Sequence, residues 1–334
     1  MKKLLISFIA SMMAIMSFAQ STLVATLTHG STIKMFYGVY ALQQAHNAAA
    51  NGDVINLSGG TFQSVDNITK GVTIRGTGTL EAFPTIISGW VTINVPSNIS
   101  NKLSFEGCCF NSPVTLKGTT NDVLFLKNSF NYDVGVIENA KHIIFVNCNI
   151  NYSLYYGDES SCTLYNSYIR DPKSGYGNNS TVNFINCAIN HSTIDGSGLN
   201  LNLIHNAIFV NCFLFLENGW SYSYYNKGIP VSSSAYYCVA VGTNAIEIFN
   251  DMIIKENCTS ATKTIFTDGN PWNDLTDEAK TKYLGNDGTP VGMYGGVYPF
   301  SLVPSYPTIT KMNVANKTTA DGKLSVEIEV SAAE

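Results

Sequence analysis

The chain has 334 residues, of which 45% are hydrophobic and only 13% charged, and its formal net charge is −5. This length is enough for one elongated domain, and an acidic chain without a basic cluster is not suited to bind nucleic acid. Glu, Lys and Arg are scarce while Asn, Ser, Thr, Tyr and Gly are abundant, which favours strands and tight turns over helices.

The N-terminus has the features of a secretory signal. Lys2 and Lys3 precede an apolar run over residues 4–18, and Ser17 and Ala19 supply the small side chains of a cleavage site. The run is shorter than the 18 or more residues that a membrane-spanning helix needs. We therefore expect residues 1–19 to be removed and the mature protein, without a membrane span, to be periplasmic or extracellular, at the cell surface.

A short helix is predicted at about residues 37–50. Leu42, Ala45 and Ala49 fall on one face at helical spacing, and Gly52 is placed to end the helix before a strand begins at Val54. A helix at this point would cover the open end and the unpaired strand edges of a stacked β-structure. We therefore interpret it as a capping helix.

Six similar segments follow one another through the middle of the chain. Each contains an apolar residue near its end, and these residues are separated by 20, 20, 19, 20 and 25 positions: Phe110, Phe130, Ile150, Ile169, Ile189 and Leu214. The period is too short for helical repeats, and the alternation of apolar and polar positions indicates short strands. Because each unit returns to the same register, we predict an all-β solenoid, a single-stranded parallel β-helix over residues 20–300.

Two stretches resemble a known superfamily. The sequence ALQQAHNAAANGDVINLSGGTF at 41–62, followed by VTIRGTG at 72–78, resembles the capping helix and first turns of the pectin-lyase-like superfamily. The segment 284–300 is similar to the close of secreted β-helix proteins from Bacteroidetes-type bacteria, most without an assigned activity. This resemblance implies a right-handed β-helix, a structural place for Arg75 in the first turns, and a secreted, carbohydrate-related protein.

Asparagines recur at two positions of the repeat. One set holds Asn147, Asn166, Asn186 and Asn211, with Asn128 taken as displaced by a one-residue deletion; the other holds Asn111, Asn131, Asn151 and Asn190, which Arg170 and Phe215 interrupt. Asn tolerates the left-handed backbone of a sharp turn and can pass hydrogen bonds between neighbouring units. We interpret both sets as structural; a polar ligand-binding stripe is the alternative.

Cysteines also recur at one position. The members are Cys108, Cys148, Cys187 and Cys212, with Ser129 and Ser167 assigned to the gaps. The exchange of Cys with Ser indicates a position that needs a small side chain, so buried thiols are favoured over disulfides. Cys187 and Cys212, on consecutive units, stay open as a pair. No zinc-binding spacing is present, so no metal site is expected.

One predicted outward column carries the candidate chemistry. It holds Ser112, Tyr132, Tyr152, Asp171 and His191, with Arg170 and Asn190 beside it and Lys173 and Asp195 further along. Arg170, Asp171 and His191 are the candidates for acid–base catalysis. The other interpretation is a solvated face with ordinary salt bridges, because the paired carboxylates of polysaccharide hydrolases are not found here.

Aromatic side chains suggest a binding surface. Tyr132, Tyr152 and the insertion containing Trp220 lie in polar contexts where flat rings can stack on sugar faces. With Asp171 and His191 they form the predicted ligand-binding site. Packing of the tyrosines between units is the alternative.

The C-terminal part changes character. A short helix is predicted within 271–284, with Asp274 or Thr276 as its N-cap, and residues 301–334 are predicted to form a small β appendage with strands at 308–313 and 323–330. We expect this appendage to cover the last unit or to pair along one side.

The sequence thus favours a non-catalytic, monomeric protein that binds a polysaccharide or cell-surface glycan. The alternative is a polysaccharide lyase or glycoside hydrolase, for which calcium would be the expected cofactor; no other cofactor is predicted. A structural role as an adhesin or surface-layer component is a third interpretation. The chain has only two arginines, and this shortage favours the binding protein.

Overall fold

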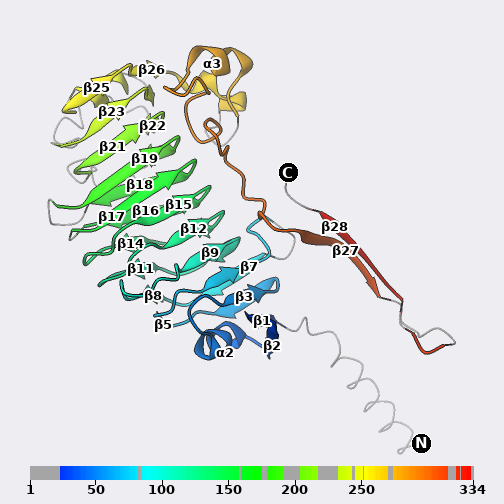
Figure 1. Cartoon of the computed structure of the whole chain (residues 1–334). Helices are drawn as coiled ribbons and strands as arrows, with labels where there is room; N and C mark the ends of the chain where they lie inside the picture. The colour runs from blue at the N-terminus through cyan, green and yellow to red at the C-terminus, as the bar shows by residue number, and fades with distance from the viewer. Residues whose placement is uncertain are drawn as a thin grey trace, which may run out of the picture.

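A computed structural model describes residues 23–80, 84–157, 159–174, 179–191, 204–216, 232–242, 245–250, 252–269, 274–314, 321–323 and 325–331. The predicted signal peptide and Trp220 lie outside these residues. The described part is dominated by long, mostly parallel sheets, as an all-β fold predicts (Figure 1). Successive repeats add one strand to each sheet in turn.

The first sheet has twelve strands. In spatial order they are β2 (Thr32–Tyr37), β1 (Val24–His29), β3 (Val54–Leu57), β6 (Thr73–Arg75), β9 (Ser104–Glu106), β12 (Leu124–Leu126), β15 (Ile143–Val146), β17 (Ser161–Tyr165), β19 (Thr181–Ile185), β21 (Ala207–Val210), β23 (Ser234–Tyr236) and β25 (Ile254–Glu256). All pairs from β3 onward are parallel, and β1 pairs antiparallel with both of its neighbours.

The second sheet has a main path and a branch. The main path is β4 (Gly60–Gln63), β7 (Thr85–Ser88), β10 (Cys108–Phe110), β13 (Ser129–Phe130), β16 (Asn149–Tyr156), β18 (Tyr168–Ser174), β20 (Ala188–His191), β22 (Phe213–Leu216), β24 (Val239–Val241) and β26 (Thr259–Ala261). The branch is β5 (Asn67–Ile68), β8 (Val91–Ile93), β11 (Val114–Leu116) and β14 (Val134–Val136). Both arms meet at β16, which is long enough to pair with β13 and β14.

The core is built from stacked side chains of equivalent positions. Phe105, Phe125 and Phe145 form one stack, with ring centroids 5.5 and 5.0 Å apart, and Phe110 stacks on Phe130 at 4.9 Å. Such pairs add to the stabilisation that burial of the rings provides. The 20-residue step therefore places like residues in contact, as the repeat predicts.

The cysteine position has a hydrogen-bonding role. The thiol of Cys148 donates to the carbonyl oxygen of Val146 at 3.4 Å, and Ser167 Oγ donates to Tyr165 O at 2.7 Å in the same way. Ser167 Oγ also accepts from Cys148 N at 3.0 Å. All eight cysteines are free thiols, so the expected burial of unpaired thiols is confirmed for Cys108, Cys148, Cys187 and Cys212.

The assignment of Asn128 and Ser129 was wrong by one position. Cys109 pairs with Ser129, so Asn128 stands at the cysteine position, where its Oδ1 accepts from Cys108 N at 2.8 Å. Lys127 then takes the left-handed turn with φ of 56°. No deletion separates these repeats, and a single Asn meets the same need for an internal donor and acceptor as the cysteines.

Helix α2 (Ala41–Ala48) lies within the range expected for a capping helix and packs at the first strands (Figure 1). Its C-terminal carbonyl groups are held by Lys70, whose Nζ donates to the carbonyl oxygens of His46, Asn47 and Ala49 at 2.7 to 2.9 Å. A cation at this end satisfies unpaired carbonyls and complements the helix dipole. His46 is buried, and burial together with Lys70 lowers its pKa to about 4.

The C-terminal part packs on the later strands and then turns back. Short 3-10 turns (Ala245–Phe249, Lys263–Ile265 and Thr267–Gly269) and helix α3 (Asp277–Lys282) precede it, and Thr276 is the N-cap of α3, accepting from Ala279 N at 3.3 Å. Phe266, Tyr283 and Met293 bury the outer face of β18, β20, β22 and β24. Residues 284–306, which we call the C-terminal strap, lead back to the first repeats (Figure 1).

The strap is held by the first set of asparagines. Asn147, Asn166, Asn186 and Asn211 all have positive φ, as predicted for a left-handed turn. Asn166 Nδ2 donates to Met293 O at 3.0 Å and to Gly295 O at 2.6 Å. The Asn166 side chain therefore binds the strap.

Further strap contacts lie toward its two ends. Asn211 Nδ2 donates to Asn286 Oδ1 at 2.9 Å. At the far end, Ser305 N donates to Glu106 Oε1 at 3.0 Å and Tyr306 donates to Gly76 O. Arg75 lies over the Tyr306 ring and beside Glu106. These contacts give Arg75 a structural role, as the resemblance implied.

The last two strands, β27 (Thr308–Val314) and β28 (Val326–Ser331), form an antiparallel hairpin beyond the strap (Figure 1). They overlap the two ranges, 308–313 and 323–330, where strands are predicted. The hairpin is a separate two-stranded sheet and does not extend either of the long sheets.

Candidate functional site

A series of short linkers joins the main path of the second sheet to its branch. They are residues 88–90, 111–113 and 131–133, continued by residues 151–153 within β16 and 170–171 within β18, and we call their surface the corner strip. Register pairs on both sides of each linker fix its position, for example Phe110 with Phe130 and Val114 with Val134. Equivalent linker residues therefore stand one strand spacing apart, about 4.8 Å.

Two of the predicted residues lie together on this strip. Tyr132 and Tyr152 are 50% and 42% exposed. The pairs Phe130–Ile150 and Val134–Leu154 lie two residues before and after them, so the two tyrosines are neighbours on consecutive repeats. The sequence placed this pair correctly because the step between these repeats is 20 residues.

The predicted column is interrupted after Tyr152. Ser153, and not Tyr152, pairs with Asp171, because the register of β16 and β18 shifts between Ile150 and Ser153. In the repeat of β18, two residues (170–171) stand where the preceding repeats have three. Asp171 is only 6% exposed, so it is not part of an outward face.

Asp171 belongs to a compact polar cluster instead. Its Oδ2 accepts from Lys173 Nζ at 2.6 Å and from Ser153 Oγ at 3.3 Å. Partial burial disfavours the Lys173 ammonium, but the hydrogen bond and charge of Asp171, with smaller contributions from Tyr155 and Asp133, raise the pKa of Lys173 above its ordinary value. The lysine is therefore a charged hydrogen-bond donor at neutral pH.

Tyr155 borders this cluster. It is 36% exposed, and Lys173 Nζ lies 5.5 Å from its ring centroid, within range of a cation–π interaction. Its neighbour on the previous repeat is Gly135, which has no side chain to cover the ring. Tyr155 thus adds a third exposed ring near Tyr152.

The second set of asparagines forms a ladder along the corner strip. Asn131 Nδ2 donates to Asn111 Oδ1 at 2.7 Å, and Asn151 Nδ2 donates to Asn131 Oδ1 at 3.0 Å. The amide dipoles point the same way, and Arg170 follows in the next repeat, with Nη1 3.5 Å from Asn151 O. A cation at the acceptor end of aligned dipoles is electrostatically favourable. Asn190 departs from the ladder, since it is buried and donates to Tyr168 Oη at 3.1 Å.

The side chains of the other predicted site residues lie outside what the structure describes. His191 ends β20, where its backbone pairs with Leu216, and its side chain is outside what the structure describes. Trp220 lies outside the described residues altogether. Trp90, which the sequence reasoning missed, is 78% exposed on the corner strip. Val91 pairs with Val114, so Trp90 is equivalent to Pro113 of the next repeat. Aligning these two repeats would have placed Trp90 on the corner strip.

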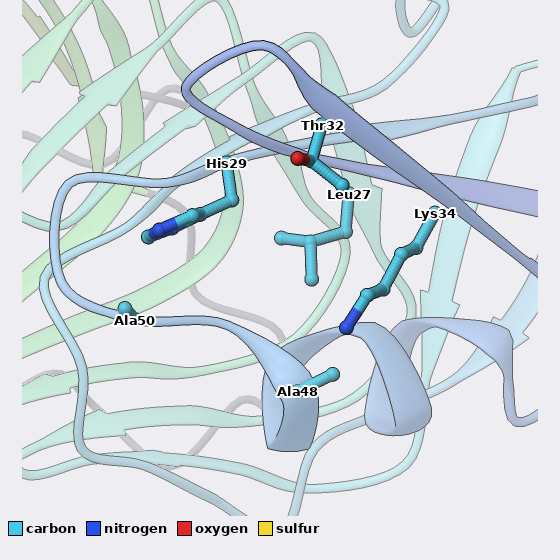
Figure 2. Close-up of a pocket in the computed structure, with 6 residues that line it drawn as sticks. All are labelled: Leu27, His29, Thr32, Lys34, Ala48 and Ala50. Carbon is cyan, nitrogen blue, oxygen red and sulfur yellow. The ribbon is translucent and has the colours of Figure 1, made fainter.

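A separate cavity of about 300 Å³ lies between the β1–β2 hairpin and the end of α2 (Figure 2). Figure 2 shows Leu27, His29, Thr32 and Lys34 around it, with Ala48 and Ala50 from the helix side. His29 Nδ1 is 2.6 Å from Asp53 Oδ1, and Asp53 Oδ2 accepts from Ala50 N at 2.8 Å. This volume is at the lower limit of small-molecule pockets and does not suit a polymer.

Burial disfavours ionisation of Asp53, but the hydrogen bonds from Ala50 and His29 and the charges of His29 and Lys70 outweigh it and lower the pKa of Asp53. Its carboxylate therefore fixes the imidazole of His29 and the turn after α2. The contact between His29 and Asp53 therefore ties the β1–β2 hairpin to the turn after α2.

Within the described residues, no three His, Cys, Asp or Glu side chains are grouped so that they could hold a metal ion. Asp171, one of the candidate acidic residues, is ion-paired with Lys173 at 2.6 Å. Among the same residues, no helix has both the length and the apolar character needed to cross a bilayer.

Comparison with protein-family models finds no match to this chain. Searches of curated proteins and of solved structures likewise return no significant match.

Proposed function

We propose that the chain is a secreted, right-handed parallel β-helix protein of the pectin-lyase-like type that binds a polysaccharide or cell-surface glycan without transforming it. The parallel sheets and the step of 19 to 20 residues between β13, β16, β18 and β20 support this architecture. The predicted signal peptide supports export to the periplasm or the cell surface.

The observation that carries the proposal is the set of exposed tyrosines beside the asparagine ladder. Tyr132, Tyr152 and Tyr155 present rings on neighbouring repeats, and Asn131 and Asn151 supply directional amide groups next to them. Sugars combine apolar faces with many hydroxyl groups, so a surface of this composition suits them. A rigid sheet also presents these groups at little cost in conformational entropy.

The polar cluster supports binding over catalysis. A general base must be unprotonated at the working pH, whereas the raised pKa of Lys173 keeps it charged. Arg170 lies in the strip but faces a backbone carbonyl group, that of Asn151. A lyase or hydrolase, the alternative, would need Asp171 released from Lys173.

The test is a glycan-array screen followed by calorimetry on the best ligand. Tyr152→Ala and Tyr132→Ala should each weaken binding about five- to tenfold, because each removes a stacking surface. Tyr298→Ala is the matched control, since Tyr298 is 68% exposed but belongs to the strap. Binding that is unchanged in both corner variants would refute the site.

Turnover of the bound glycan must be measured in parallel, with and without calcium. We expect none. Product formation that is lost in Lys173→Ala or Arg170→Ala while binding persists would favour the enzyme instead. Light scattering should find a monomer, and the mass of the exported protein should correspond to a chain that begins at Gln20.

A further inference from the structure

We infer that the ligand is a linear, uncharged polysaccharide that lies along the stacking direction of the repeats, with Trp90 as its far contact and the Arg170 repeat at the other end. This inference rests on the proposed function and names the class and orientation of its ligand. It brings in Trp90, which lies three repeats before Tyr152 on the same strip.

The backbone on both sides of Trp90 is fixed. Gly89 N donates to Ser112 Oγ at 2.9 Å, and the carbonyl oxygen of Trp90 accepts from Ser64 Oγ at 3.1 Å. Gly89 has a φ of 102°, and a Cβ there would lie 2.4 Å from the Gln63 amide nitrogen. The indole is therefore exposed on a corner that its neighbours on both sides hold in place. An exposed Trp on a rigid support is a strong stacking surface.

The groups between Trp90 and Tyr152 repeat along the stacking direction. Asn111, Asn131 and Asn151 recur once per repeat, about 4.8 Å apart, and each amide retains hydrogen-bonding capacity beyond the ladder itself. A chain lying along the strip meets one amide per repeat and reaches all the rings. A chain lying across it would meet one linker and at most one or two rings.

The charge distribution indicates an uncharged ligand. The twelve linker residues 88–90, 111–113, 131–133 and 151–153 include no Lys or Arg, and Asp133 is their one charged member. A polymer with a carboxylate on every sugar would place its charges against amides, hydroxyls and one aspartate. The cations lie at the end of the strip: Arg170, whose Nη1 faces Asn151 O, and beside it Lys173, which is already bound to Asp171.

The strip also sets a length. Register pairs lead from Ile87 through Phe110, Phe130 and Ile150 to Ile169, four steps in all. Four strand spacings are about 19 Å. Because one spacing is close to the length of one sugar unit in an extended chain, about four or five units should fill the strip.

The test uses uncharged oligosaccharides of two to six units, from the glycan that the array identifies, and calorimetry on the full chain. Affinity of the natural protein should rise with length and level off at about four or five units. Trp90→Ala should leave the two-unit ligand unaffected, whereas Tyr152→Ala should weaken every length. For the six-unit ligand, Trp90→Ala should lower affinity about tenfold. Tyr298→Ala is again the control.

The outcomes separate the two proposals. Binding that depends on Tyr152 but not on Trp90 at any length would overturn this inference and leave the glycan-binding function standing. Tighter binding of a polyuronate than of its uncharged counterpart would overturn it as well. If no glycan binds the natural protein, both proposals fall.

Discussion

The two sets of asparagines recur at nearly the same interval, yet their surroundings differ. Asn166 and Asn211 lie under the C-terminal strap and hydrogen-bond to it, whereas Asn111, Asn131 and Asn151 bond to one another on an open corner. In the covered set, the Asn166 amide donates its hydrogen bonds to backbone carbonyl oxygens of the strap. The open set keeps capacity for a ligand, and that difference locates the site.

Asn166→Ala should have the largest effect. The change removes two buried donors from the carbonyl oxygens of Met293 and Gly295 and places a non-Gly, non-Asn residue at φ of 44°. We expect a loss of about 3 kcal/mol in the free energy of unfolding, measured by urea denaturation. Asn166→Gly, which tolerates the backbone, should recover part of it. A loss below about 1 kcal/mol would show that the strap is not held there.

Cys148 tests the hydrogen-bonding role of the position next to the covered turn. Cys148→Ser should be nearly neutral because Ser167 makes the same bond one repeat later, whereas Cys148→Ala leaves the Val146 and Phe125 carbonyl oxygens without this donor and should cost about 1 to 2 kcal/mol. Thermal unfolding of both variants measures the order. An alanine variant more stable than the serine variant would contradict it.

Asn131→Ala sharpens the comparison from the open side. Both of its ladder bonds are exposed to solvent, so the expected cost is about 0.5 to 1 kcal/mol, well below that of Asn166→Ala. Glycan affinity should fall nonetheless. A cost equal to that at Asn166, with affinity unchanged, would mean that both sets are purely structural.

Lys173 gives the smallest effect, a change in alkaline stability. Its folded pKa is raised above the ordinary 10.5, so its contribution is complete below that value and is lost as the pH rises through the folded pKa. Urea denaturation of Lys173→Met should therefore show a shallower loss of stability above pH 10.5 than the natural protein. Parallel curves in this range would indicate that the contact with Asp171 contributes little.

The repeat spacing was enough to predict the sheets. Phe105, Phe125 and Phe145 stack because 20 residues separate them, and the same step placed Tyr132 next to Tyr152. The register shift between β16 and β18 was not predicted. Three residues separate Ile150 from Leu154 on β16, but only two separate their partners Ile169 and Pro172 on β18. Proline at 172 carries no pattern that marks it as the partner of Leu154.

The strap could not be predicted from the repeats. Asn166 and Gly295 are 129 residues apart, and nothing in the spacing of either segment indicates the other. Asn was expected at a left-handed turn, which the positive φ of Asn147, Asn166 and Asn186 confirms, and its side chain was expected to bond to the neighbouring repeat. The ladder of side-chain bonds between consecutive repeats is made by Asn111, Asn131 and Asn151 of the second set.

The strap changes how the molecule should unfold and assemble. In an array where each unit touches only its neighbours, folding can begin anywhere and spread. Here the hydrogen bond between Tyr306 and Gly76 joins residues 230 positions apart. The strap therefore connects the first repeats directly to the C-terminal part of the chain. Contacts between residues so far apart in the sequence form slowly. During synthesis, the first repeats should therefore reach their full stability only after almost the entire chain has left the ribosome.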